Sequence, residues 1–495
     1  MQFVHLSWEM PGIREGRLIN RLGAEKPSMS TRQIRFLFVD PPCQRFTGYY
    51  RFYFPSGLAS LAAIVKQQGH LALVADLEHD PGDSSKTFVE NVLSPTTLTE
   101  VLGSHSIWSE YHRLLEDYAP DIVGITVLSP KVVFARKLAE LTKQWRRNTT
   151  VIVGGDHVTA RPQDLLRDPN VDIAVRGEGE VIISKLLGQI MAVGGSNGVR
   201  GISYREDDKI VSTPREQPMA NLDELPFPDR SSLHKVDTYR PLDMGMLTTT
   251  RGCPYACSFC HVPVQWPGHI RERSVPSVLQ EIGEVITTYG TDYFSFRDPT
   301  FTFNRQRTVE LCRNLRKLAP GIRWECLTKP NHLDGDLIAE MKASGCTKMR
   351  LGIESGSPAI LEYMRKGASM EDVRRAVRLL REAKLDWAAY FMLGVPRETP
   401  ETMNETYEFM RELDPPFISL TRYVPTPGTE MFQDVVALGL LDPDATDWTW
   451  SLNQSLEKVF LACMDPDVFR AKMLDIGAFV QRHNRAKGLR DNRLK

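Results

Sequence analysis

Several features that define common protein classes are missing from this sequence. No apolar run is long enough to span a bilayer, and the amino terminus has no signal-peptide core. The net charge is -1, so no global field draws in DNA, RNA or an anionic membrane. We see no repeat of solenoid length and no low-complexity tract. These absences exclude a membrane-spanning chain and disfavour a nucleic-acid partner.

Cysteine is also scarce, which excludes a disulfide framework. The 495 residues include eight cysteines, and three of them lie in one short loop, a pattern typical of the reducing cytoplasm. The apolar fraction of 42% and the charged fraction of 25% are those of an ordinary globular protein. The length allows two or three domains with separate cores. We therefore expect a soluble cytoplasmic enzyme.

The three clustered cysteines follow the spacing Cys253-x-x-x-Cys257-x-x-Cys260. Three thiolates hold a cubane [4Fe–4S] cluster and leave its fourth iron without a protein ligand. A closed zinc site needs four ligands, and His261 is poorly placed to share a metal with Cys260. The spacing thus favours the cluster over structural zinc, with all three cysteines catalytic. Four other cysteines are predicted to be packing residues: Cys312, Cys326, Cys346 and Cys463.

Residues 34–195 alternate continuous apolar strands with amphipathic helices, whereas residues 1–33 show no periodicity and are predicted to be a loosely ordered extension. Met29 is a second candidate for the first residue of the chain. The alternation predicts a parallel, flavodoxin- or Rossmann-like sheet covered on both faces, with ligands at the carboxyl ends of its strands. Strands are expected at Ile34–Val39, Leu71–Ala75, Ile122–Thr126, Thr150–Val153 and Ile173–Val175, with helices at Gly57–Gln68, Val132–Trp145 and after Glu180.

A second alternating region follows a predicted linker at residues 196–240, which includes a short hairpin near Ile202–Val211. Residues 241–440 contain six strand-then-helix units, with the cysteine loop after the first strand. This pattern predicts a partial (β/α)6 barrel, and residues 441–495 a short helical region with its best amphipathic stretch at Val468–His483. Strands are expected at Met246–Thr249, Tyr293–Phe296, Arg323–Leu327, Lys348–Leu351, Ala388–Met392 and Phe417–Arg422, and helices near 276–289, 305–318, 334–344, 370–384 and 399–412.

The segment Thr250-Arg-Gly-Cys-Pro-Tyr-Ala-Cys-Ser-Phe-Cys260, with aromatic Phe259 before its third cysteine, resembles the radical S-adenosylmethionine (SAM) superfamily. The resemblance implies that SAM binds at the open iron and is reductively cleaved to a 5′-deoxyadenosyl radical. It also implies an electron donor such as flavodoxin or ferredoxin. A non-enzymatic scaffold remains an alternative, which reductive cleavage of SAM would exclude.

Polar groups at later strand ends match cofactor-contacting segments of that family. Asp298 lies in the segment that faces the methionine amino group, through its carboxylate or a backbone carbonyl, and Lys329 stands where relatives often have an arginine for the methionine carboxylate. Glu354 and Ser355 match the ribose-contacting segment, and Gly394 matches the backbone that approaches adenine. Taken singly, Asp298 is equally consistent with a turn and Glu354 with a helix cap.

The first half resembles the cobalamin-binding domain that precedes the barrel in one large branch of the superfamily. Glycine-rich turns at strand ends let the backbone pack against a large flat ligand. The motif that supplies a histidine to cobalt, Asp-x-His-x-x-Gly, is absent, so the resemblance implies a corrinoid bound without a histidine ligand. Other flavodoxin-like domains share the Gly-Gly turn, and loss of the corrinoid stays an alternative. The residues implied in binding are Pro41, Ser129, Gly154, Gly155, His157, Gly177 and Glu178.

The combined resemblance implies a cobalamin-dependent radical SAM methyltransferase acting on an unactivated carbon of a small molecule. A radical SAM oxidative cyclase or ring-rearranging enzyme of the tetrapyrrole or hopanoid type is the alternative. A methylthiotransferase is disfavoured because the first domain has only Cys43 and no basic RNA-binding tail exists. Aromatic residues near the strand ends suit a hydrophobic or ring-bearing substrate, although each is equally consistent with core packing: Tyr255, Trp266, Phe301, Trp387, Tyr390 and Tyr423.

Overall fold

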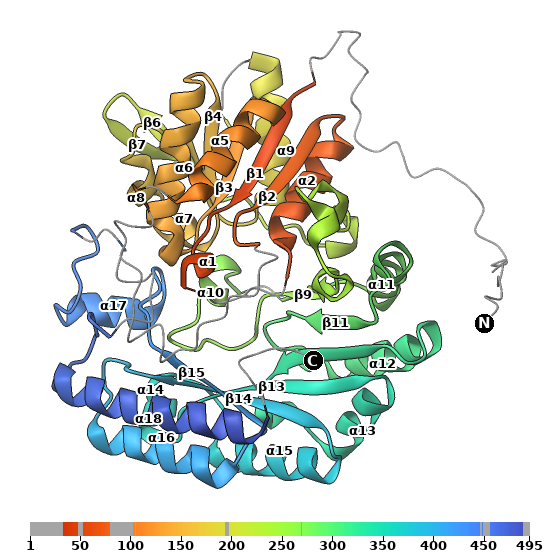
Figure 1. The fold of residues 1–495 in the computed structure, drawn as a ribbon, viewed down its shortest axis with the longest axis vertical. Helices are drawn as coiled ribbons and strands as arrows, with labels where there is room; N and C mark the ends of the chain where they lie inside the picture. Colours follow the sequence, from red (N-terminus) through yellow and green to blue (C-terminus); the bar gives the residue numbers. More distant parts are fainter. Residues whose placement is uncertain are drawn as a thin grey trace. The chain divides into compact units, whose positions relative to one another are not determined.

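Two sheets with parallel strands organise the chain (Figure 1). The computed structural model describes residues 33–47, 53–79, 102–103, 105–193, 198–268, 270–445, 448 and 456–488. Residues 34–495 form one unit. The extension predicted at residues 1–33 lies outside the described residues, except for Gln33.

The first sheet has seven strands, of which β1 to β5 are mutually parallel. Across the sheet they are β2 (Leu71–Asp76), β1 (Arg35–Asp40), β3 (Ile122–Thr126), β4 (Thr150–Gly154), β5 (Ile173–Val175), β6 (Ile202–Glu206) and β7 (Lys209–Ser212). Helices flank the sheet: α1 (Gln44–Thr47), α2 (Ser56–Gln67), α5 (Ser106–Tyr118), α6 (Val132–Trp145), α7 (Asp156–Ala160), α8 (Pro162–Leu166) and α9 (Gly179–Val193).

Alternate residues of β1 enter two different hydrophobic cores, which explains the continuous apolar strand. Phe36 and Phe38 pack in the core that includes residues of α2 and α9. Leu37 and Val39 pack in the core that includes residues of α5 and α6. A parallel strand buried on both faces must be apolar at every position. The predicted doubly covered α/β sheet is thus confirmed.

Two parts of the first sheet differ from the prediction. The hairpin β6–β7 pairs antiparallel with β5 and extends the sheet, whereas the sequence predicts it within the linker at residues 196–240. The sequence pattern also predicts no helix at α5, whose first turn is capped by His105 accepting a hydrogen bond from the Ile107 N–H. The hairpin joins the sheet because β5 would otherwise leave an unpaired edge.

The second sheet has six parallel strands and confirms the predicted partial (β/α)6 barrel. Its order is β15 (Phe417–Arg422), β14 (Asp386–Leu393), β13 (Cys346–Glu354), β12 (Arg323–Thr328), β11 (Tyr293–Phe296) and β8 (Met246–Leu247). The main helices are α11 (Val275–Tyr289), α12 (Arg305–Leu318), α13 (Gly335–Ala343), α15 (Met370–Glu382), α16 (Pro400–Leu413) and α18 (Pro466–Ala486).

Short elements connect these units. The antiparallel pair β9 (Thr250–Arg251) and β10 (Arg271–Glu272) flanks the cysteine loop, and α10 (Val262–Gln265) follows the loop. The other short helices are α14 (Pro358–Tyr363) and α17 (Glu430–Ala437), together with the 3-10 turns at Ser129–Lys131, Leu222–Glu224, Arg230–Ser232, Val236–Thr238, Pro241–Met244 and Pro330–His332.

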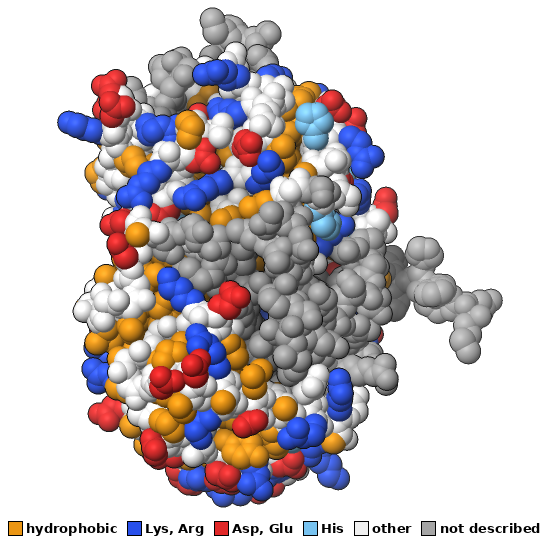
Figure 2. Space-filling model, turned by 60° about the vertical axis from the view of Figure 1, so that its left-hand side comes forward, with side chains coloured by type: hydrophobic (Ala, Val, Ile, Leu, Met, Phe, Trp, Pro, Cys, Tyr) orange, Lys and Arg blue, Asp and Glu red, His pale blue; other side chains and the backbone are white. Residues whose placement is uncertain are grey.

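The barrel strands alternate between a helix-packed face and an inner face. Trp324 and Met349 belong to the hydrophobic core, whereas Glu325 and Arg350 on the same strands point to the other side. The inner face of the barrel is therefore polar. No described helix is long and apolar enough to cross a membrane. Basic and acidic side chains are interspersed on the described surface visible in Figure 2.

The turn after β4 gives a first test of the fold. Gly155 has φ +106°, and a Cβ there would lie 2.9 Å from the Val127 carbonyl oxygen. Gly154 is the matched control, because its Cβ would meet nothing closer than 3.7 Å. We expect Gly155→Ala to lower the free energy of unfolding by about 1–3 kcal/mol and Gly154→Ala by well under that amount, measured by urea denaturation. Equal losses in both variants would contradict the strained turn.

Candidate active site

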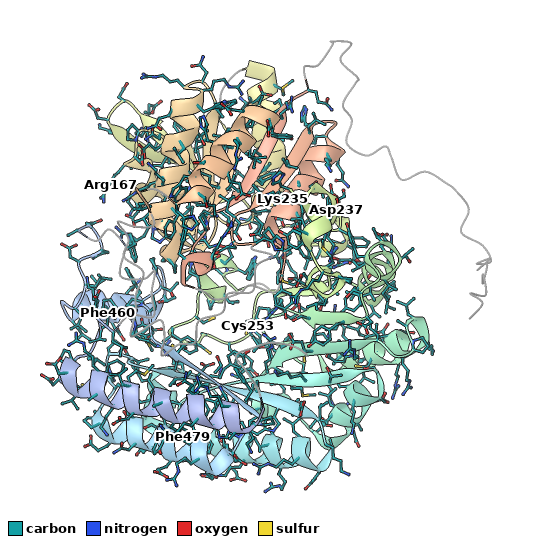
Figure 3. All side chains as sticks on the ribbon, in the orientation of Figure 1. Arg167, Lys235, Asp237, Cys253, Phe460 and Phe479 are labelled. Carbon is teal, nitrogen blue, oxygen red and sulfur yellow. The ribbon has the colours of Figure 1, made fainter. Side chains whose placement is uncertain are left out.

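The three predicted cluster cysteines share one loop between β9 and α10, where Figure 3 labels Cys253. The loop is fixed by backbone contacts to the segment after α14: the Ser258 N–H donates to the Met364 carbonyl at 3.0 Å, and the Ser258 hydroxyl to the Tyr363 carbonyl at 3.0 Å. All three thiols are partly exposed, and they lie within electrostatic range of one another. The structure therefore brings the three predicted ligands together.

The surroundings of these thiols suit a metal cluster. Burial raises the pKa of Cys260 to about 11, and burial also raises the pKa of Cys257 against the opposing charges of Lys366 and Lys329. Thiols in such an environment keep their protons until iron replaces them, because a coordinated thiol is deprotonated outright. Two lysines close to the loop offset part of the negative charge that a thiolate-bound cluster carries.

The donor set matches a cubane cluster better than a single ion. Among the described residues, no three His, Cys, Asp or Glu side chains are arranged to hold one metal ion together. A cubane cluster places each thiolate on a different iron, so its ligands do not converge on one point. The residues present thus fit a [4Fe–4S] cluster held by Cys253, Cys257 and Cys260.

Asp298 supports the strand end that leads into the cysteine loop. Its carboxylate is fully buried and accepts hydrogen bonds from the Thr249 N–H (2.6 Å), the Thr249 hydroxyl (2.6 Å) and the Thr250 N–H (3.0 Å). Arg307 donates to the same Thr249 hydroxyl at 3.2 Å. The carboxylate is therefore occupied inside the protein, which leaves the backbone carbonyl as the group at this position that could face a ligand amine.

Glu354 and two lysines form a charged group near the cysteines. Lys366 Nζ lies 2.8 Å from Glu354 Oε1, and Lys329 donates to the Lys366 carbonyl. Burial lowers the pKa of Lys329 to about 8, and its ammonium lies 3.3 Å from the ring centre of Tyr255. Glu354 has φ +71°, a conformation that is rare for glutamate. The roles of Glu354 and Lys329 toward SAM stay predictions, and Lys366 was missed because no motif marks it.

Three other predicted cofactor residues have internal contacts. The Ser355 hydroxyl is buried and bonded to Thr406 at 2.9 Å. Gly394 has φ +89°, and its N–H donates to buried Glu398 at 3.1 Å. Phe259 packs against the core that also contains Met364. These contacts are internal to the protein, and the contact of all three residues with SAM stays a prediction.

A cavity of about 540 Å³ lies at the carboxyl ends of β1, β3, β4 and β5. This is where parallel α/β sheets bind ligands. Four of the seven residues implied in corrinoid binding line it: Gly154, Gly155, Gly177 and Glu178. Pro41, Ser129 and His157 do not line it. Glycines on one wall and apolar side chains such as Leu128 and Phe227 on others fit a flat macrocycle.

His157 is held away from any metal by two hydrogen bonds. Its Nδ1 lies 3.0 Å from the Ser129 hydroxyl and its Nε2 lies 3.2 Å from Asp164. The ring is 1% exposed, and burial lowers its pKa. Both ring nitrogens are thus engaged, in agreement with the missing cobalt-ligand motif. No histidine lines the described cavity.

Glu178 connects the cavity wall to the cysteine loop. Its carboxylate accepts from the Trp266 indole N–H (2.7 Å) and pairs with Arg271 (2.5 Å) and Arg251 (3.2 Å). Burial would raise the pKa of Glu178, but these arginines outweigh it and lower the pKa. Arg251, which also pairs with Glu180, stands two residues before Cys253. Glu178 is therefore part of an ion-pair network. The sequence predicts no role for the arginines of this network, although Arg251 lies within the segment Thr250–Cys260.

The remaining predicted side chains divide between cavity and core. Trp266 lines the cavity, and Tyr255 and Tyr390 are half-buried. Three of the listed aromatics are core residues instead: Phe301, Trp387 and Tyr423. Cys312, Cys326 and Cys346 are buried as packing residues, but Cys463 is exposed, so the packing role predicted for it was wrong. Its place in a loop before α18, outside any strand or helix, explains the difference.

Comparison with known proteins agrees with this architecture. Residues 247–410 match the family model of the Radical SAM superfamily, and residues 49–187 match that of the B12 binding domain. The chain is 30% identical over 390 residues to "Uncharacterized methyltransferase PH0819" of Pyrococcus horikoshii, covering 78% of this chain and 79% of that protein.

Two further similarities bear on function and fold. The chain is 31% identical over 328 residues to "Anaerobic magnesium-protoporphyrin IX monomethyl ester cyclase" of Rubrivivax gelatinosus, covering 64% of this chain and 58% of the cyclase. A solved structure of the radical S-adenosylmethionine methyltransferase TsrM from Kitasatospora setae, with cobalamin and a [4Fe-4S] cluster bound, aligns with a TM-score of 0.65 at 19% identity. That alignment covers 84% of this chain and 78% of TsrM, and shows a shared fold.

Glu398, which holds the Gly394 turn, gives a pH-dependent prediction. Burial raises its pKa from 4.5 to about 7. Between these pH values the folded chain keeps a proton that the unfolded chain releases, so stability falls as pH rises. We expect the free energy of unfolding to drop by up to about 3 kcal/mol across this window.

Glu398→Gln should remove that dependence, because the amide stays neutral and keeps an acceptor for the Gly394 N–H. Exposed Glu401→Gln, in the first turn of α16, is the control and should follow the wild type. Urea denaturation at pH 5 and pH 8 measures both. A parallel decline of wild type and Glu398→Gln would contradict the assignment.

Proposed function

The chain belongs to the radical SAM superfamily, in the group that carries a B12 binding domain, and on this basis we propose that it methylates an unactivated carbon of a small molecule. The cofactors of this group are a [4Fe–4S] cluster, SAM and cobalamin. The observation that carries the proposal is the ion-pair network of Glu178, which joins the wall of the cavity in the first sheet to the strand before Cys253.

When bound, the cluster and cobalamin supply the electron and the methyl-carrying chemistry that side chains lack. The protein contributes the residues that would hold and orient these cofactors. Cys253, Cys257 and Cys260 would hold the cluster, and Lys366 and Lys329 place positive charge beside it. The glycine wall at Gly154 and Gly177 would hold the corrinoid at the facing strand ends. Bringing both reactive centres close together and away from bulk water would favour group transfer between them.

An oxidative cyclisation is the second candidate, favoured by the similarity to the cyclase of Rubrivivax gelatinosus. That similarity covers 58% of the cyclase, against 79% of the Pyrococcus methyltransferase. The broader coverage supports methyl transfer.

The cluster assignment is tested by replacing its ligands one at a time. We expect Cys253→Ala, Cys257→Ala and Cys260→Ala to lose the iron–sulfur absorbance of anaerobically reconstituted protein and its formation of 5′-deoxyadenosine. Cys463→Ala is the matched control, because this exposed cysteine lies outside the loop, and it should retain both signals. Deoxyadenosine formation by any of the three loop variants at the wild-type rate would overturn the assignment.

The reaction type is tested by product mass. Candidate metabolites are incubated with reconstituted, cobalamin-loaded protein, SAM carrying a deuterated methyl group, and a strong reductant. Methyl transfer predicts a product heavier by one labelled methyl group in place of hydrogen. Formation of deoxyadenosine with an unlabelled, oxidised or rearranged product would favour cyclisation instead.

A further inference from the structure

The inner face of the barrel carries several charged side chains that have no predicted role in binding the cofactors. Arg297, at the end of β11, Glu325 on β12 and Lys348 and Arg350 on β13 all point away from the helix-packed core. We call these four residues the inner-face cluster. Tyr390 on β14 lies close enough to interact electrostatically with both arginines. The cluster lies below the strand ends that carry Asp298, Lys329 and Glu354.

Glu325 supplies the only carboxylate of the inner-face cluster, and other side chains of the protein bind both of its oxygens. Glu325 is completely buried and pairs with Arg350 through both of its oxygens, with the Arg350 Nε at 3.1 Å from Oε2. Ser295 and Tyr53 also donate to Glu325 Oε1, at 2.8 and 2.9 Å. Burial would raise the pKa of Glu325, but Arg350 and Arg297 outweigh it and lower the pKa. Glu325 and Arg350 therefore form a closed ion pair.

Arg297 and Lys348 are left without a carboxylate partner among the described residues. The Arg297 guanidinium lies 4.0 Å from the ring centre of Tyr53, and the Lys348 ammonium lies 5.4 Å from that of Phe417. Glu325 and Asp386, the latter exposed at the start of β14, are within electrostatic range of Lys348, but neither forms an ion pair with it. Three cations thus face one buried carboxylate.

A cation that is partly withdrawn from water is stabilised when an anion accompanies it. Arg297 and Lys348 are both half-buried, and this burial lowers the pKa of each side chain. A purely structural cluster would be complete with Glu325 and Arg350. At the same time Arg297, Lys348 and Tyr390 remain partly exposed, so the inner face is not filled by the chain itself.

We propose that Arg297 and Lys348 bind an anionic group of the substrate, a carboxylate or a phosphoryl group, on the inner face of the barrel. The proposal rests on the function proposed above and specifies its substrate class. Arg297 immediately precedes Asp298, so an anion bound there directs the rest of the molecule toward the cysteine loop. Arginine recognises both anions through paired N–H donors, and lysine adds a point charge.

Anion binding by reconstituted, cobalamin-loaded protein tests this proposal. Inorganic phosphate and acetate are titrated separately, and binding is followed by isothermal calorimetry and by broadening of the phosphate or acetate NMR signal. Arg297→Gln and Lys348→Gln should each weaken binding about tenfold or more, equivalent to ~1.4 kcal/mol. Arg323→Gln is the matched control, because this arginine on β12 is exposed and pairs with Asp292 at the surface.

Tighter binding of phosphate than of acetate would assign a phosphoryl group, and the reverse order a carboxylate. Absence of binding to the wild type, or unchanged binding in Arg297→Gln and Lys348→Gln, would overturn the proposal. The iron–sulfur absorbance and the formation of deoxyadenosine without substrate are recorded on the same samples. Anion binding without deoxyadenosine would contradict the proposed function alone, and deoxyadenosine without anion binding would contradict this inference alone.

Discussion

The common direction of the strands is the constraint on which this structure depends. In both sheets the carboxyl ends of the parallel strands lie at one edge, so every loop that follows a strand is available to one site. The glycine turns after β4 and β5 line the cavity of the first sheet. The cysteine loop follows the first strand of the second sheet. Residues about a hundred positions apart, such as Gly154 and Cys253, thereby lie at strand ends that one site can use.

Buried charges connect these two edges. Glu178 and Glu180, at the start of α9, pair with Arg251 directly before the cysteine loop. Breaking one member of such a buried pair leaves an uncompensated charge, which is costly. The network therefore fixes the loop relative to the cavity wall. Asp298 has a similar role at the end of the preceding strand, where it is bonded to Thr249 and Thr250. All three carboxylates position the loop that carries the predicted cluster ligands.

The charged side chains on the inner face of the barrel differ from these positioning residues, because only some of them are paired. Glu325 and Arg350 satisfy each other, whereas Arg297 and Lys348 have lost hydration without gaining a carboxylate partner among the described residues. Paired charges maintain the fold, and unpaired ones at a partly exposed surface suit a ligand. This contrast separates residues that build the site from residues that are free to recognise a substrate.

The sequence by itself determined the two α/β sheets and the order of the domains, and it predicted the three cysteines proposed to hold the cluster. Cysteine spacing and apolar alternation are local patterns, which can be recognised in a sequence without knowledge of the fold. Only the tertiary structure decided which polar groups are already occupied. Asp298 and Ser355 lie in segments that resemble those of the family, and His157 follows the Gly154–Gly155 turn, yet each is bonded to another residue of the chain. The sequence predicts no role for Lys366, Arg251 or Arg297, whose contacts form only on folding. A side chain's availability depends on its neighbours in space, and a linear sequence does not specify those neighbours.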